Sequence, residues 1–237
     1  MQFNITWNED NYKDLLKYLE NNKDDKYKEF HKKIVNYDNV IGVKSDELKK
    51  IAKEISKNDY KSFFKVNNSN LHELIMIEGF IIGYLKTEFE DVINYSNNYL
   101  KKVKTWAHID SYVSNLKIIK KYPKDGFTYA KKLIHSKNNY TKRCGIIMLL
   151  NYYLHDKYID KVLEIVSKIK TNDYYVKMAI SWLMSVAYIK YKEKTLVYIV
   201  NIKDDFAYNK TLSKIIESNR ISKEEKEFIK SLKKKNG

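Results

Sequence analysis

The chain has 237 residues, with 45 Lys and Arg against 30 Asp and Glu, so its formal net charge at pH 7 is +15. A hydrophobic content of 43% excludes a disordered chain, and one Pro with six Gly excludes collagen-like or linker-like low complexity. So few turn-forming residues also disfavour a β-sandwich or barrel, and the composition therefore predicts an all-helical protein.

Apolar residues recur at helical spacing along almost the whole chain. The first expected helices lie near residues 12–19 and 27–35, a turn-rich stretch follows at 36–42, and Ser45 is expected to cap the next helix. Further helices are predicted at 59–66, 70–86, 88–103, 106–122, 123–136, 139–155, 157–170, 172–190, 195–200, 206–219 and 222–234. No strand is expected from this pattern.

Four of the long predicted helices, at 70–86, 106–122, 139–155 and 172–190, begin 36, 33 and 33 residues apart. This rhythm predicts an α-solenoid, in which each helix pair buries its apolar face against the next pair. No TPR or ankyrin consensus recurs, so HEAT-like repeats fit best. The four helices are then expected to line a basic concave groove.

No stretch rich in Pro, Gly or Ser marks a linker, which predicts one continuous domain over residues 1–237, with a basic tail at 226–237 that is expected to fray. The single cysteine, Cys144, lies beside an apolar run and is expected to be a buried thiol in a reducing compartment. The N-terminus carries no secretory pattern and no apolar run reaches membrane-spanning length. These features predict a cytoplasmic protein with no membrane attachment, and a solenoid of this size is expected to be a monomer.

The positive charge favours a polyanionic partner, because lysines attract phosphates and binding releases counterions. Arg143 and Arg220 are the only arginines, however, and the dominance of Lys, Asn, Ile and Tyr is typical of chains encoded by AT-rich codons. Charge alone therefore does not separate a nucleic-acid-binding protein from a lysine-rich helical scaffold.

Trp106 and Asp110 are four residues apart, so a helix places them one turn apart on the same face. Ile109, Val113 and Leu116 then form the inward stripe, and an aromatic side chain is presented with a carboxylate beside the core. The alternative is a solvated Asp110 beside an aromatic residue that packs in the core or at a helix interface.

Two further residues are candidates for a binding site. Trp182 lies well inside a long predicted helix, where core packing is the usual outcome for tryptophan. Arg143 is unusual in a chain that otherwise uses lysine, and its guanidinium can hold a phosphate bidentately, whereas a structural salt bridge is the alternative.

The motifs of metal and nucleotide sites are missing from the sequence. The five histidines form no HExxH or i,i+4 pair, one cysteine cannot build a zinc site, and no glycine-rich phosphate loop is found, so no metal or other cofactor is expected. Glu78 lies within an apolar run and is expected to be buried, where such a residue more often bonds to a neighbouring helix than acts in catalysis.

Taken together, five features in this order resemble the AlkD-like DNA alkylation repair proteins. They are residues 39–44, residues 48–53, Trp106 to Asp110, Lys142 with Arg143, and Trp182, within a region from about Tyr27 to Arg220. The resemblance implies a HEAT-like repeat fold and a nucleoid-associated protein that binds double-stranded DNA. It further implies a monofunctional glycosylase that removes cationic N3- and N7-alkylated purines, in base excision repair, without flipping the base into a pocket.

By position, the resemblance implies that Asp110 is the catalytic carboxylate, that Trp106 and Trp182 are aromatic walls, and that Arg143 binds phosphate. Nearby lysines are expected to hold the DNA backbone with Arg143: Lys142, Lys177 and Lys210.

The chain departs from the family pattern at three positions. Ser185 stands where an arginine follows the second tryptophan, Thr105 replaces an aromatic residue, and Tyr27 aligns only loosely with a tyrosine of the groove. Two alternatives therefore stay open, namely a non-catalytic binder of damaged or branched DNA on the same scaffold, and a helical scaffold for protein partners.

Overall fold

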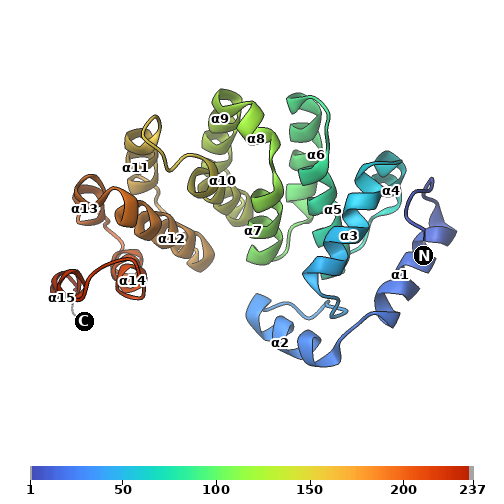
Figure 1. Cartoon of the computed structure of the whole chain (residues 1–237), viewed down its shortest axis with the longest axis horizontal. Coiled ribbons are helices and arrows are strands. Elements are labelled where there is room, and N and C mark those ends of the chain that lie inside the picture. The colour runs from blue at the N-terminus through green and yellow to red at the C-terminus, as the bar shows by residue number, and fades with distance from the viewer. Residues whose placement is uncertain (1, 235–237) are drawn as a thin grey trace. The chain divides into compact units, whose positions relative to one another are not determined.

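The computed structural model describes residues 2–234, and within this range it contains fifteen helices and no strand (Figure 1). The expectation of an all-helical fold is therefore confirmed. The described chain divides into two compact units, with the boundary after Pro123. Each unit has its own buried core, and the expectation of one continuous domain over residues 1–237 stays a prediction.

The first unit is built around three helices that pack side by side, α5 between α3 and α7. α5 is almost completely buried, while α4 contacts α3 and α6 contacts α5, so the helices are arranged as adjacent pairs. The helices of this unit are α1 (Glu9–Asn21), α2 (Asp25–Val35), α3 (Ser45–Ser56), α4 (Tyr60–Val66), α5 (His72–Tyr84), α6 (Phe89–Lys102), α7 (Trp106–Asn115) and α8 (Ile118–Lys121).

The second unit repeats this arrangement with α12 between α10 and α14, while α11 and α13 contact each other and α12. Its helices are α9 (Pro123–Ile134), α10 (Asn139–Tyr152), α11 (Ile159–Ser167), α12 (Tyr174–Lys190), α13 (Lys192–Ile199), α14 (Asp205–Ile216) and α15 (Lys223–Ser231). Within each unit, the repeating pairs are those of a helical repeat array. Cys144 is a buried thiol on α10, as expected.

Glycines allow neighbouring helices of the first unit to approach closely. A Cβ atom on Gly83 of α5 would lie 2.8 Å from the carbonyl oxygen of Asn115 on α7, and one on Gly79 would lie 2.7 Å from the hydroxyl of Tyr99 on α6. The atom facing Gly83 belongs to the backbone, so α5 can lie this close to α7 only because Gly83 lacks a side chain, whereas a side chain at Gly79 would have to displace the Tyr99 ring.

Two predicted helix boundaries are wrong. Ser45 does not cap α3, because Lys44 occupies the N-cap position and no side chain accepts a hydrogen bond there. The single helix predicted over 106–122 is two helices, because Leu116 leaves helical geometry and the chain turns at Lys117. Leu116 and Ile119 are both buried across this turn, so the apolar spacing continues although the helix does not.

The C-terminal region is helical over part of the range where fraying is expected. Residues 226–231 belong to α15, whose Ile229 is fully buried, and Tyr208 donates a hydrogen bond to the carbonyl oxygen of Leu232 at 2.7 Å. Residues 235–237 lie outside the described residues.

Candidate functional site

The N-terminal half of α7 carries the two residues that the sequence singles out together. Thr105 caps this helix, because its hydroxyl oxygen accepts a hydrogen bond from the His108 amide, and Trp106 is therefore the first helical residue. Asp110 follows one turn later on the same face and is partly exposed. Ile109, Val113 and Leu116 are fully buried, which confirms the predicted inward stripe.

Trp106 is fixed by contacts with α2 and the loop that follows it. Its indole packs against Val35, Val40 and Ala107, and its Nε1 donates a hydrogen bond to the carbonyl oxygen of Ile34 at 3.3 Å. The ring is only partly buried, so it combines the packing of an interface aromatic with an accessible surface. This arrangement gives the indole one preferred orientation beside Asp110.

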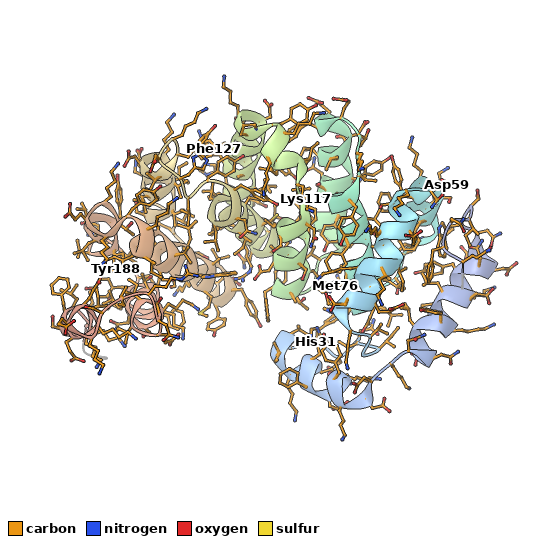
Figure 2. All side chains as sticks on the ribbon, viewed as in Figure 1. His31, Asp59, Met76, Lys117, Phe127 and Tyr188 are labelled. Carbon is orange, nitrogen blue, oxygen red and sulfur yellow. The ribbon has the colours of Figure 1, made fainter. Side chains whose placement is uncertain are left out.

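Three histidines form a chain of hydrogen bonds from α2 through α5 to α7, and Figure 2 labels the first of them, His31. His31 Nε2 lies 3.0 Å from His72 Nε2, and His72 Nδ1 lies 2.8 Å from His108 Nε2. The Lys104 amide donates to His108 Nδ1 at 3.2 Å, so the hydrogen of the neutral His108 ring must be on Nε2. Each ring then donates to the next, from His108 to His72 and from His72 to His31.

Metal-ligand spacing does not reveal this histidine chain, so the sequence-based predictions do not include it. The three residues are 41 and 36 residues apart, close to the repeat length, and this spacing is the signal that the sequence offered. Burial lowers the pKa of His72 to about 2 and that of His108 to about 3, so both rings are neutral at physiological pH. They hold α7, and with it Trp106 and Asp110, against α5.

A buried carboxylate holds the loop between α2 and α3. Glu73, fully buried on α5, accepts hydrogen bonds from three successive amides, those of Ile41 at 3.0 Å, Gly42 at 2.8 Å and Val43 at 3.3 Å. Gly42 has a positive φ of 107°, which places its amide beside the carboxylate and favours glycine at this position. Because α2 buries only Val35, this loop and the histidine chain provide much of its attachment.

Glu78, also on α5, is buried and bonds to neighbouring helices, as the sequence predicts. It accepts hydrogen bonds from Asn67 at 2.7 Å and from Lys102 of α6 at 2.9 Å. Burial raises the pKa of this carboxyl group, while Lys102 and Asn67 partly oppose the shift. Glu78 therefore links α5 to α6.

Trp182, in the second unit, does not pack in the core as most tryptophans do. Its side chain is 38% exposed on α12, so its indole is available for a contact outside the unit. Ser185, one turn later, is only 4% exposed and donates a hydrogen bond to the Trp182 carbonyl oxygen at 2.8 Å. In the AlkD-like family that the sequence resembles, this position carries an arginine, whereas in this protein it faces the interior of the unit.

The basic residues expected at the DNA backbone differ in their accessibility. Arg143 is 5% exposed and donates a hydrogen bond to the Tyr175 carbonyl oxygen at 2.6 Å, so it connects α10 to α12. Lys177 forms an ion pair with Asp204, the N-cap residue of α14, at 2.6 Å. Lys142 and Lys210 are half-exposed and form no ion pair with any residue that the structure describes.

The structure places Trp106 and Asp110 together on one helix of the first unit, and Trp182, Arg143 and the three lysines on α10, α12 and α14 of the second. Between residues 2 and 234, no group of three His, Cys, Asp or Glu side chains has an arrangement that could hold a metal ion. None of the helices in that range is long and apolar enough to span a membrane.

A comparison with protein families matches residues 12–227 to the family described as DNA alkylation repair enzyme. The match includes every helix from α2 to α14, and therefore most of both units. Neither the comparison with curated proteins nor that with solved structures gives a match. The matched region covers most of the chain, and the protein therefore belongs to the family of DNA alkylation repair enzymes.

Proposed function

We propose that this protein is a DNA glycosylase that hydrolyses the N-glycosidic bond of cationic N3- and N7-alkylated purines in duplex DNA. Membership of a DNA alkylation repair family makes DNA the substrate. The observation that carries the proposal further is the pairing of Asp110 with Trp106 on one face of α7, where both side chains are partly exposed. A partly exposed acid in a protein with a net charge of +15 suits a positively charged reaction partner.

The alkylated base already carries a positive charge, so it leaves with the bonding electron pair and becomes neutral. The sugar is then left with oxocarbenium character, and the Asp110 carboxylate stabilises this positive charge. The same carboxylate orients a water molecule, whose oxygen attacks C1′ while its proton passes to the carboxylate and then to solvent. The products are the free base and an abasic site, and no cofactor is needed for this hydrolysis.

The two indoles have complementary properties in this proposal. The electron-rich face of an indole attracts a developing positive charge and also packs against deoxyribose. Trp106 is held in one orientation by its hydrogen bond to Ile34 and therefore serves as a fixed wall beside Asp110. Trp182 is exposed and has room to contact the DNA backbone.

Phosphate binding is assigned first to Lys142 and Lys210, whose ammonium groups have no acidic partner among the described residues. Lys177 can bind phosphate only in competition with Asp204. Arg143 positions α12 through its hydrogen bond to the Tyr175 carbonyl oxygen, and because it is only 5% exposed, a phosphate contact can come only from the small exposed part of its side chain.

The test is the release of 7-methylguanine or 3-methyladenine from methylated duplex DNA by the purified protein. The variant Asp110→Asn is expected to abolish release and to keep duplex affinity, whereas the control Glu90→Gln, at an exposed acid of α6, keeps both. No release by the unmodified protein, with duplex binding retained, would support the non-catalytic DNA binder instead. No duplex affinity at any salt concentration would support the protein scaffold.

A further inference from the structure

The first unit contains a hollow of roughly 1010 Å³ that the proposed chemistry does not use. It lies where three successive helix pairs turn, from α3 to α4, from α5 to α6 and from α7 to α8. Lys117, in the last of these turns, is labelled in Figure 2. Each of the three turns contributes at least one lysine to this hollow, which we call the lysine pocket.

The lysine pocket is strongly cationic. Its lining has one acid, Glu88, and five lysines: Lys53, Lys57, Lys86, Lys117 and Lys121. Glu88 is also engaged, because it accepts a hydrogen bond from the Tyr122 hydroxyl at 2.9 Å. Five ammonium groups around one hollow repel each other, and a bound anion relieves this repulsion.

Several of these ammonium groups have no partner among the residues that the structure describes. Lys57 pairs with Glu54 at 3.1 Å, and Lys121 lies 4.9 Å from the Tyr122 ring centroid. The ammonium groups of Lys53, Lys86 and Lys117, by contrast, form no hydrogen bond or ion pair with any residue between 2 and 234. Elsewhere in the same unit, exposed lysines commonly pair with an acid one turn away, including Lys13 with Asp10, Lys17 with Asp14, Lys49 with Asp46 and Lys50 with Glu47.

The walls of the lysine pocket are held in place by close packing. Gly83 and Asn115 are in direct contact and fix the ends of α5 and α7 against each other. Tyr60 and Tyr84 add partly exposed rings and hydroxyl groups to the lining. The pocket is therefore formed before a ligand arrives, and its donors are spread over three helix turns rather than gathered at one point.

We propose that the lysine pocket binds the phosphodiester backbone of DNA that flanks the damaged nucleotide. Neighbouring packed helices are about 8 to 10 Å apart, so lysines on three successive turns match an extended polyanion better than a single phosphate. The pocket begins at Asn115, about 7.5 Å beyond Asp110 along the axis of α7 at 1.5 Å per residue. The inference rests on the proposed function only for the choice of DNA as the polyanion that lies near Asp110.

The experiment compares two triple variants of equal charge. The pocket variant is K53Q/K86Q/K117Q, and the control is K131Q/K137Q/K161Q, whose lysines are also exposed and also without a partner among the described residues. Both are placed in the Asp110→Asn background, and their affinity for an undamaged duplex is measured against salt concentration. Each lost phosphate contact lowers the slope of log K against log salt by about 0.9, so the pocket variant is expected to lose about 2.7 and the control much less.

Three outcomes would overturn the inference. One is an equal change of slope in both variants, which would mean that only net charge matters. Another is a lower melting temperature of the pocket variant with an unchanged slope, because lysines then serve only to compensate the carboxyl-terminal dipoles of α3, α5 and α7. The last is binding of inorganic pyrophosphate that the pocket variant abolishes without any change in the duplex slope, which would assign the pocket to a small phosphate compound.

Failure of the proposed function is distinguishable from failure of this inference. If no alkylated base is released but the slopes differ as expected, the glycosylase proposal fails and the lysine pocket stands. If alkylated bases are released but the pocket variant and the control have the same salt slope, the glycosylase proposal stands and the lysine pocket proposal fails.

Discussion

His72 Nδ1 and His108 Nε2 lie 2.8 Å apart, and this hydrogen bond joins the start of α5 to the start of α7. Both rings are buried, and the chain continues from His72 to the half-buried His31 on α2. Other groups around the chain are Tyr27, stacked on His31, and Glu73, which is bonded to amides of the adjacent loop. No carboxylate among residues 2–234 is hydrogen-bonded to the three histidine rings, so added protons lack a compensating charge within hydrogen-bonding distance.

Acid is therefore expected to destabilise the protein. The pKa of His72 is lowered to about 2 and that of His108 to about 3, against an unfolded value near 6.5, so the folded state binds fewer protons than the unfolded state. The contribution of the neutral His72 and His108 rings to the stability of the folded state is complete above about pH 6.5 and is lost as the pH falls towards 3. Each histidine lowers the free energy of unfolding by about 1.4 kcal/mol per pH unit in this window. Urea unfolding between pH 7 and 4 measures the slope, which His108→Gln should reduce and His135→Gln, at an exposed position, should not.

Glu73→Gln is expected to detach the loop between α2 and α3. The two carboxylate oxygens of Glu73 accept hydrogen bonds from three backbone amides. A glutamine has only one accepting oxygen, and its NH2 group would face a backbone N–H, where no hydrogen bond can form. The expected loss is about 2 to 4 kcal/mol of unfolding free energy, since the bonds are charge-assisted and buried. Hydrogen exchange at Ile41 to Val43 should accelerate selectively. Unchanged protection of these amides would contradict the role assigned to Glu73.

The two tryptophans should respond differently to truncation. Trp182→Ala removes an exposed ring, so its stability cost is expected to be below about 1 kcal/mol while base release falls. Trp106→Ala also removes packing against Val35 and the hydrogen bond to Ile34, and should cost about 2 kcal/mol. Thermal unfolding and base-release assays on both variants provide the comparison. An equal loss of stability would mean that Trp182 is packed as firmly as Trp106.

Introducing arginine at Ser185 should not strengthen DNA binding. The position is 4% exposed and the serine hydroxyl is bonded within α12, so a guanidinium there must be buried or must displace its neighbours. Ser185→Arg is expected to cost more than about 2 kcal/mol, and Ser185→Ala less than about 1 kcal/mol. Denaturant titration with duplex-binding measurements tests this. A stable Ser185→Arg variant with tighter duplex binding would show that the site can open.

Removal of the Asp110 charge should act on the rate rather than on affinity. Loss of one electrostatic group aimed at a developing charge commonly lowers a rate by about 100- to 1000-fold. Asp110→Asn is therefore expected to slow single-turnover release of 7-methylguanine by at least this factor, with duplex affinity and melting temperature nearly unchanged. A large fall in melting temperature would instead assign Asp110 a structural role.

The sequence predicts the local features of the candidate site well. The i,i+4 spacing placed Trp106 and Asp110 on one face of α7, and the apolar stripe beside them is as expected. The break at Leu116 was not predictable from apolar spacing, because Leu116 and Ile119 remain buried on both sides of the turn. Helical periodicity records which residues face the core, and it does not record whether the backbone stays helical between them.

Contacts between helices far apart in the chain could not be predicted from the sequence. Arg143 stood out as an arginine among lysines, but its burial depends on Tyr175 of another helix. The burial of Ser185 and the exposure of Trp182 likewise depend on how α12 is rotated against its neighbours, and helices as apolar as α12 show no clear polar face in their sequence.

The small buried surface of α2 affects how long the Trp106 indole keeps its orientation. Since α2 fully buries only Val35, we expect it to open locally at a smaller free energy than the unit as a whole unfolds. Each opening of α2 removes the Ile34 carbonyl from the indole, so the lifetime of the docked helix limits how long the ring keeps its orientation. We therefore expect local opening of α2 and the orientation of the Trp106 indole to be coupled.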